Sequence, residues 1–263
     1  MSERTSLPVY HGLREILLRY DRKSAVAILS LVASQVAVGL SYRDLVGEHA
    51  WMWEDHLLLF SWGLMTLLLS WDIRPRRDLL LAIVGFGGGL VIEWWGTTTE
   101  LWIYFTEERP PIWILPAWPA AALAIDRLGR LATAIRPIES HAWTAYWTLL
   151  PLFVSAMTAF LWPSFRIPSS WVVLALMLST LFWRPLHHRD VCLFLGGSAL
   201  GILLETWGTT RGCWTYYTGE TPPWIAVAAH GFASVAFSRG VQLLDIALDL
   251  GFRGLAGPAV KSR

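Results

Sequence analysis

Long apolar runs separated by short polar stretches dominate the chain from about residue 24 onward. Eight runs can be drawn, most of them close to the roughly 20 residues that a helix needs to cross the hydrocarbon core of a bilayer. They cover residues 24–40, 56–71, 79–95, 112–126, 142–162, 170–183, 191–207 and 222–238. Some are short, so we expect tilt or continuation into interfacial residues. The pattern predicts an all-α polytopic membrane protein with about eight transmembrane helices.

The second half of the chain repeats the first. Residues 77–127 align without a gap on residues 189–239, at a constant shift of 112 residues, and more than a third of the aligned positions are identical. The predicted repeats, 24–126 and 142–239, hold four apolar runs each. Because an even number of spans returns the chain to the same side, we expect two parallel four-helix repeats about an axis along the membrane normal.

Positive charge is distributed unevenly between the polar stretches. Lys and Arg gather in the N-terminal arm 1–23, after the second and sixth runs, in the linker 127–141 and in the tail 240–263, whereas the alternate loops are acidic. By the positive-inside bias, both termini are cytoplasmic in a multi-pass cell-membrane protein. Spaced apolar residues predict an interfacial helix in the linker and an amphipathic cytoplasmic tail. The basic first 23 residues precede no small-residue cleavage site, so no removable signal peptide is expected.

Composition supports the membrane assignment and excludes other classes. Apolar residues make up 54% of the chain and charged residues 16%, against about 25% charged residues in soluble domains. Many of the 17 tryptophans lie at the ends of apolar runs, as in aromatic belts. A net charge of +1 gives no case for a nucleic-acid partner, and two cysteines cannot build a disulfide framework. No metal-ligand or haem spacing is present, so no metal or other cofactor is expected.

One glutamate in each copy lies deep in an apolar run. Gly85, Gly89, Glu93 and Thr97 follow one another at four-residue steps, and so do their counterparts, Gly197, Gly201, Glu205 and Thr209. Residues four apart share a helix face, and small residues at that spacing let helices approach closely in a bilayer. The carboxylates are therefore predicted to point into the protein. They are either structural clasps, which accept hydrogen bonds from Thr, Trp or amides exposed by a helix break at Gly96 and Gly208, or catalytic acid/base groups.

The residues after each glutamate predict its surroundings. Trp, Tyr and Thr recur at every second position, which favours an extended loop that folds over the glutamate as a lid. The copies also differ: Trp118 corresponds to His230, and Thr99 to Arg211. The candidate catalytic residues are Glu93 and Glu205. The candidate substrate-binding residues are Thr97, Thr98, Trp102, Tyr104, Thr209, Thr210, Arg211, Trp214, Tyr216 and His230.

Two groups of charged residues outside this motif have simpler interpretations. Arg77-Asp78 and Arg189-Asp190 open the third and seventh runs, where Asp serves as N-cap and Arg as topology anchor. Residues 54–56, Glu-Asp-His, begin the second run without a counterpart in the second copy and are interpreted as a solvated helix end.

The segment from Leu204 to Thr218, which reads LETWGTTRGCWTYYT, resembles the membrane carotenoid hydratase family of carotenoid biosynthesis. That family has an intramembrane Glu, a Gly-Thr turn, a Tyr-x-Tyr-Thr stretch and a proline-led helix that ends near a Trp. The first copy matches it through Glu93, Gly96, Thr97, Tyr104, Pro111 and Trp118. The chain lacks the family's Phe-Gly pair before the first Tyr, and its spacing to the prolines is shorter. The resemblance implies a long isoprenoid substrate whose terminal double bond a glutamate protonates before water adds.

Three functions follow as alternatives. The first is an intramembrane protein, a lyase or hydratase if an enzyme, that acts on a lipid or carotenoid-like isoprenoid by glutamate acid/base chemistry. The second is a proton-coupled transporter or carrier of a small amphipathic solute. The third is a non-catalytic structural subunit of a membrane complex. The expected partners are a membrane lipid or isoprenoid, with a homo-oligomer or larger membrane complex left open.

Overall fold

The computed structural model describes residues 19–41, 51–133 and 136–255. These residues form eight α-helices, two short 3-10 turns and one pair of short strands. In chain order they are α2 (Arg22–Ser41), α4 (Asp55–Ser70), α5 (Pro75–Thr98), β1 (Trp102–Tyr104), η1 (Ile112–Ile114), α6 (Ala117–Ala132), α7 (Arg136–Leu161), η2 (Trp162–Ser164), α8 (Pro168–Phe182), α9 (His187–Thr210), β2 (Trp214–Tyr216) and α10 (Trp224–Leu255). Each predicted apolar run overlaps one helix, and of the helices described only α10 extends beyond its run by more than half of its length.

Among the residues that the structure describes, four helical segments are long and apolar enough to cross a membrane. They are α2, α5, residues 138–164 of α7 with η2, and α9. Helices α4 and α8 are also apolar but shorter, with 16 and 15 residues. The prediction of a helical protein rich in membrane-crossing segments is therefore confirmed in this coarser form.

Two predicted boundaries are wrong. Residues 127–141 do not form a separate interfacial helix, because α6 continues to Ala132 and α7 begins at Arg136. The tail 240–252 is not a separate helix either, since α10 runs unbroken from Trp224 to Leu255. No proline interrupts residues 224–255, so nothing forces the helix to end at the edge of the apolar run.

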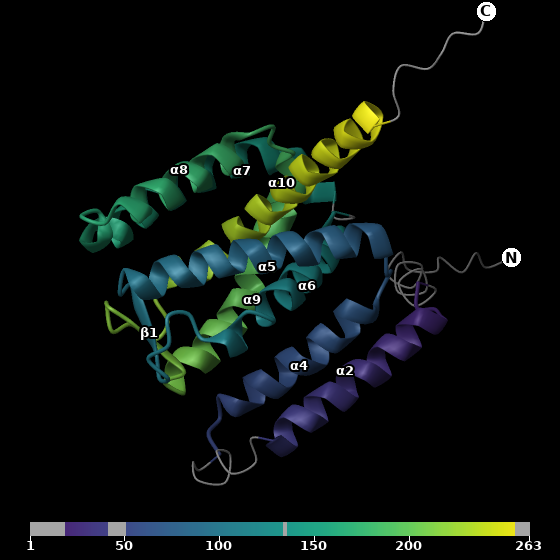
Figure 1. The fold of residues 1–263 in the computed structure, drawn as a ribbon, viewed down its shortest axis with the longest axis horizontal. Coiled ribbons are helices and arrows are strands. Elements are labelled where there is room, and N and C mark those ends of the chain that lie inside the picture. Colours follow the sequence, from purple (N-terminus) through teal and green to yellow (C-terminus); the bar gives the residue numbers. More distant parts are fainter. Residues whose placement is uncertain (1–18, 42–50, 134–135, 256–263) are drawn as a thin grey trace, which may run out of the picture.

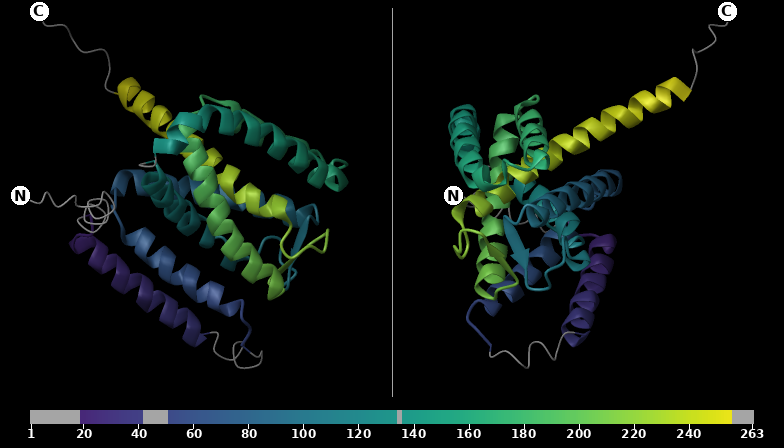
Figure 2. Two further views of the ribbon diagram at one scale, coloured as in Figure 1. Left: turned by 180° about the vertical axis from the view of Figure 1, so that it is seen from behind. Right: turned by 60° about the vertical axis from the view of Figure 1, so that its left-hand side comes forward.

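Helices α5, α6, α9 and α10 form the centre of the molecule. Helix α5 packs on α6, α6 on α9, and α10 on both α9 and α5. Around this centre α4 contacts α6 and α9, α8 contacts α10, α7 packs on α9, and α2 packs on α4 (Figure 1). The C-terminal part of α10 projects beyond the other helices (Figure 2).

Glycines on α5 and α9 set these close contacts, as the four-residue spacing predicted. A Cβ added at Gly85 would lie 3.2 Å from the Pro119 Cα of α6, and one at Gly197 would lie 2.8 Å from the Gly231 Cα of α10. Any larger side chain would separate each helix from its neighbour, so the glycine faces are the packed faces. Glu93 and Glu205 lie on those same faces and are buried.

Candidate functional site

The two repeated glutamates lie near the C-terminal ends of α5 and α9, and each is only 4% exposed. Their burial, on helix faces otherwise made of glycine, agrees with the prediction that they point into the protein. An ionised carboxylate at such a depth must be compensated by hydrogen-bond donors. Those donors come from the strand that follows each helix and from the helix that packs against it.

Strands β1 and β2 bring the two copies together. They pair antiparallel, with Trp102 opposite Tyr216, Ile103 opposite Thr215, and Tyr104 opposite Trp214. The predicted two-residue alternation is confirmed, because Trp102 and Tyr104 are buried while Ile103 between them is exposed. The paired strands therefore direct one aromatic face toward the glutamates, as expected for a covering loop.

Glu93 accepts three hydrogen bonds from neutral aromatic donors. Its Oε2 receives the Trp102 indole N–H at 3.1 Å and the Tyr104 hydroxyl at 2.9 Å. Its Oε1 receives the Trp118 indole N–H of α6 at 3.0 Å. All three contacts place a hydrogen-bond donor on a carboxylate oxygen, so the arrangement matches an ionised, acceptor-only carboxyl group.

Glu205 has an equivalent set of partners with one substitution. The Trp214 indole N–H reaches Oε2 at 3.0 Å, and the Tyr216 hydroxyl lies 3.0 Å from Oε1 and 3.1 Å from Oε2. At the position of Trp118 stands His230, whose Nε2 lies 2.9 Å from Oε1. The candidate residues Trp102, Tyr104, Trp214, Tyr216 and His230 thus all contact a glutamate.

Aromatic contacts connect the two glutamate clusters. Trp102 packs on Tyr216 and Tyr104 on Trp214, in both cases with ring centroids 5.9 Å apart. Trp118 and His230 stack with centroids also 5.9 Å apart and planes at 14°. Trp118, the third partner of Glu93, therefore lies against His230, the third partner of Glu205. The two carboxylates share one aromatic core.

Gly96 and Gly208 make room for the indoles instead of ending the helices. Both helices continue past these glycines, to Thr98 and Thr210, so the predicted helix breaks are wrong. A Cβ at Gly96 would lie 1.8 Å from the Trp102 ring, and one at Gly208 would lie 1.9 Å from the Trp214 ring. Each indole lies across the last turn of its helix, and this position lets its N–H reach the glutamate one turn earlier.

The threonines do not contact the carboxylates. The Thr97 hydroxyl donates to the Glu93 backbone carbonyl at 2.6 Å, and the Thr209 hydroxyl donates to the Glu205 carbonyl at the same distance. Thr98 is exposed and donates to the Trp94 carbonyl, while Thr210 is half-buried in the last turn of α9. A threonine in a helix commonly donates to the backbone carbonyl four residues earlier. Here this backbone hydrogen bond replaces the predicted hydrogen bond from threonine to the glutamate carboxylate.

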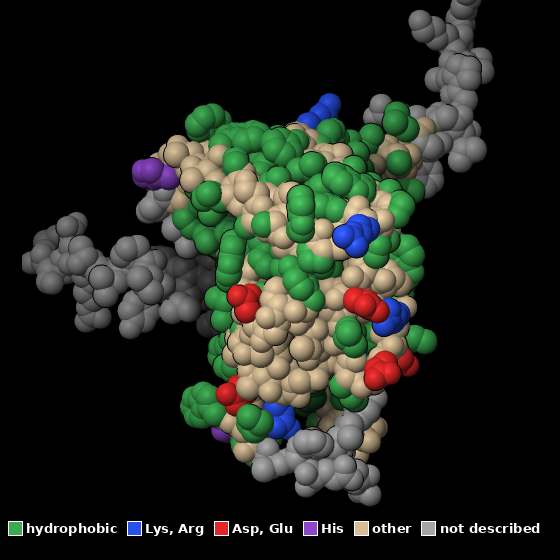
Figure 3. Space-filling view, turned by 90° about the vertical axis from the view of Figure 1, so that its left-hand side faces the viewer, with side chains coloured by type: hydrophobic (Ala, Val, Ile, Leu, Met, Phe, Trp, Pro, Cys, Tyr) green, Lys and Arg blue, Asp and Glu red, His purple; other side chains and the backbone are tan. Residues whose placement is uncertain are grey.

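Arg211 lies in a different cluster, with a residue that the sequence interpretation missed. Its Nε lies 3.3 Å from the Asp55 carboxylate of α4, which also accepts the Trp207 indole N–H at 3.2 Å. Asp55 is buried, so its assignment to a solvated helix end is wrong. Neither Asp55 nor Trp207 is shared with the glutamate clusters. Figure 3 shows the end of the molecule with the paired strands, where charged side chains are few and scattered among hydrophobic ones.

The opposite ends of α5 and α9 form a second repeated polar cluster. Arg127 of α6 holds Asp78 of α5 through both terminal nitrogens, whereas Arg239 of α10 pairs with Asp190 of α9 through Nη2 alone. Both arginines are almost completely buried. The aspartates are not N-caps as predicted: Asp78 instead accepts the backbone N–H of the cap residue Arg74 at 2.9 Å.

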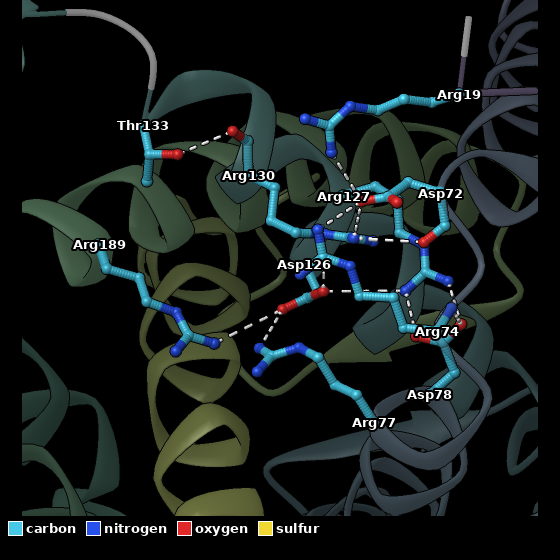
Figure 4. A network of polar contacts seen from close by, with 10 residues as sticks. All are labelled: Arg19, Asp72, Arg74, Arg77, Asp78, Asp126, Arg127, Arg130, Thr133 and Arg189. Carbon is cyan, nitrogen blue, oxygen red and sulfur yellow. Dashed lines mark hydrogen bonds and ion pairs between the residues drawn. The ribbon is translucent and has the colours of Figure 1, made fainter. Parts of the chain in front are cut away.

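Asp126 lies at the centre of this arginine cluster (Figure 4). Its Oδ1 is 2.6 Å from Arg77 and 3.6 Å from Arg189, the equivalent arginine of the other copy. Arg130 and Arg127 also lie within ion-pair distance of its Oδ2, at 3.2 and 3.7 Å. The counterpart of Asp126 is Ser238, so the equivalent arginines Arg77 and Arg189 of the two copies share one carboxylate. A cavity of about 10 Å³ adjoins Asp126 and Ser238 and is lined by four equivalent pairs of residues. It has room for about one water molecule.

The described ranges contain no group of three or more His, Cys, Asp or Glu side chains that could hold a metal ion. Comparisons with models of protein families, with curated proteins and with solved structures gave no match. Function therefore has to be inferred from the glutamate clusters themselves.

Proposed function

We propose that the chain is an intramembrane protein that acts on a lipid or carotenoid-like isoprenoid through the acid/base chemistry of its repeated glutamates. The observation that carries the proposal is the burial of Glu93 and Glu205 within one aromatic core, each held by an indole and a phenol. Ionisable groups at such depth are costly and usually serve a function. Apolar surroundings with few other polar groups suit an apolar substrate better than a hydrophilic solute.

The proposal includes eight spans arranged as two parallel repeats, with both termini cytoplasmic. The strand register agrees with a two-fold relation between the copies, because Ile103 lies opposite Thr215, its own counterpart at the shift of 112. With that axis along the membrane normal, as proposed, the copies have the same orientation. The arginine cluster would then lie at the cytoplasmic end, in agreement with the positive-inside bias.

The proposed chemistry is addition of water to a terminal carbon–carbon double bond. A protonated glutamate gives its proton to one carbon, and the π electrons form the new C–H bond. The other carbon becomes a cation, which neighbouring aromatic faces stabilise. Water adds through its oxygen, and its released proton returns to the carboxylate. The same steps in reverse describe a dehydration, so the proposal covers a hydratase or a lyase.

A structural clasp is a second candidate function, and the contacts of Glu93 favour it. Its three partners are all neutral donors, so the group is satisfied as a permanent carboxylate. Three charge-assisted hydrogen bonds would join α5, β1 and α6 at about 1.5–3 kcal/mol each. In this case the glutamates hold a subunit of a membrane complex together.

Mass spectrometry of lipid that copurifies with the protein identifies the substrate class, and Glu→Gln variants then test the role of the carboxyls. Glu93→Gln and Glu205→Gln are compared with Glu108→Gln, a repeated but exposed glutamate. An enzyme loses turnover in at least one of the first two variants and keeps its fold. A clasp loses thermal stability instead, and a proton-coupled carrier loses pH-dependent uptake into proteoliposomes. Full turnover in both buried variants refutes the proposal.

A further inference from the structure

His230 and Trp118 make the two glutamate clusters chemically different. They occupy equivalent positions and approach the same carboxylate oxygen, Oε1, at nearly the same distance, 2.9 Å in the second copy and 3.0 Å in the first. The other partners of each glutamate are the same pair of residue types, one Trp and one Tyr. A single substitution therefore separates two otherwise matched sites.

The chemistry of the two rings sets what each site can do. An indole N–H donates a hydrogen bond but cannot accept one and does not release its proton near neutral pH. Imidazole can donate or accept at Nε2, and its charge changes between about pH 5 and pH 8 when unperturbed. Glu93 is thus held by groups that cannot exchange a proton with it at neutral pH, whereas Glu205 has one partner that can.

The surroundings of His230 leave this exchange available. The His230 side chain is 17% exposed and the Glu205 side chain 6% exposed, so the imidazole is the more accessible member of the pair. From the neighbouring elements the hydroxyl of Tyr216, the indole of Trp214 and the stacked ring of Trp118 face the pair. Two sets of ionisable groups lie nearby on other elements. Glu93 and Tyr104 belong to the first glutamate cluster, and Arg211 forms an ion pair with Asp55 beyond the end of α9.

We propose that Glu205 and His230 form the proton-exchange site of the protein and that Glu93 with Trp118 is a fixed structural counterpart. This inference rests on the proposed function and names the copy that performs it. When Glu205 gives its proton to the substrate, a protonated His230 can return one from Nε2 to Oε1 and become neutral. Neutral His230 then takes the proton that the adding water releases, so that this proton reaches the carboxylate through the imidazole and the starting state is restored. His230 acts through Glu205 and is a positioning and relay residue.

Histidine ¹⁵N NMR of the full chain in lipid nanodiscs tests the exchange site without any substrate. His230→Gln identifies the His230 signal among the seven histidines. In the wild type the Nε2 proton should be shared with the Glu205 carboxyl, so that the one-bond ¹⁵N–¹H coupling at Nε2 is smaller than that of an ordinary imidazole N–H. Glu205→Gln removes the carboxyl and should restore the ordinary coupling. Glu93→Gln is the matched control and should leave the coupling reduced.

Two results overturn the inference. One is an ordinary, unreduced coupling at His230 Nε2 in the wild type, and the other is an equal response to Glu93→Gln and Glu205→Gln. Trp118→His provides an independent arm in which a second imidazole with a reduced coupling should appear beside Glu93. An unreduced coupling there would contradict the claim that the ring decides which site exchanges a proton. Because the measurement needs no substrate, a protein that shows the reduced coupling at His230 but converts no isoprenoid refutes the proposed function alone.

Discussion

Gly96→Ala tests directly whether the indole of Trp102 must lie across the last turn of α5. A Cβ at this position would lie 1.8 Å from the ring, whereas ordinary contacts begin at 3.4 Å, so the ring must move by about 1.6 Å (3.4 − 1.8). A displacement of that size breaks the 3.1 Å hydrogen bond from Trp102 to Glu93. Gly208→Ala makes the equivalent change at Trp214.

The expected loss of stability combines three effects. Overpacking costs about 1–3 kcal/mol, and a lost hydrogen bond to a charged group costs about 1.5–3 kcal/mol. The higher helix propensity of alanine returns up to about 1 kcal/mol. The free energy of unfolding of Gly96→Ala should therefore fall by about 1.5–6 kcal/mol.

Unfolding in mixed micelles, followed by near-UV circular dichroism during titration with dodecyl sulfate, measures this loss. Gly87→Ala is the control, because it changes a glycine of the same helix with no atom within 4 Å of the new Cβ. It should be neutral or slightly stabilising. If Gly96→Ala unfolds at the same detergent fraction as Gly87→Ala, the packing of the indole does not support the glutamate site.

Two further predictions concern the arginine cluster. Asp78→Asn removes the carboxylate that holds the buried Arg127 through two hydrogen bonds and leaves it only the more distant Asp126, at 3.7 Å. The free energy of unfolding should therefore fall by about 3–5 kcal/mol. Asp245→Asn, in an exposed pair with Arg76, should change it by less than about 1 kcal/mol. Equal losses in the two variants would contradict this. For Asp72, partial burial opposes ionisation, but a hydrogen bond from Arg74 and the charges of Arg130, Arg74 and Arg19 outweigh it and lower the pKa of the carboxyl. A carboxyl whose pKa is lower in the folded than in the unfolded state stabilises the fold at pH values above its unfolded-state pKa, and this stability is lost as the pH falls through the folded-state pKa. The free energy of unfolding should therefore fall less steeply with decreasing pH in Asp72→Asn than in the wild type. The same dependence on acid pH in both proteins would contradict this assignment.

Local sequence patterns were enough to predict the helices and the inward-facing glutamates. Periods of four residues identified the glycine faces of α5 and α9, and periods of two identified the aromatic face of the strands, because both depend only on neighbouring positions. The Trp and Tyr that contact each glutamate lie within eleven residues of it, and the pattern accordingly predicted them as residues of the site. Trp118 was noted as the counterpart of His230 and in the family resemblance but not as a partner of Glu93, although its equivalent position was a signal for the same contact.

Contacts between distant residues were not predictable in the same way. Asp55 and Trp207 are 152 residues apart, and no period connects them. The pairs Asp78–Arg127 and Asp190–Arg239 could have been found, since opposite charges recur with the same separation of 49 residues in both copies. The threonine hydroxyls and the continuity of α10 were misjudged because a helix can satisfy its polar groups with its own carbonyls and can extend past an apolar run.

Conversion of a linear isoprenoid in heavy water is the measurement closest to the central claim, which is that a buried carboxyl transfers a proton to carbon. The product formed by the wild type should carry a deuterium on carbon as well as the added water, and Glu93→Gln should give the same labelled product. Glu205→Gln, at equal amounts of folded protein, should form none. A product without deuterium on carbon, or an equally labelled product from Glu205→Gln, would contradict the account.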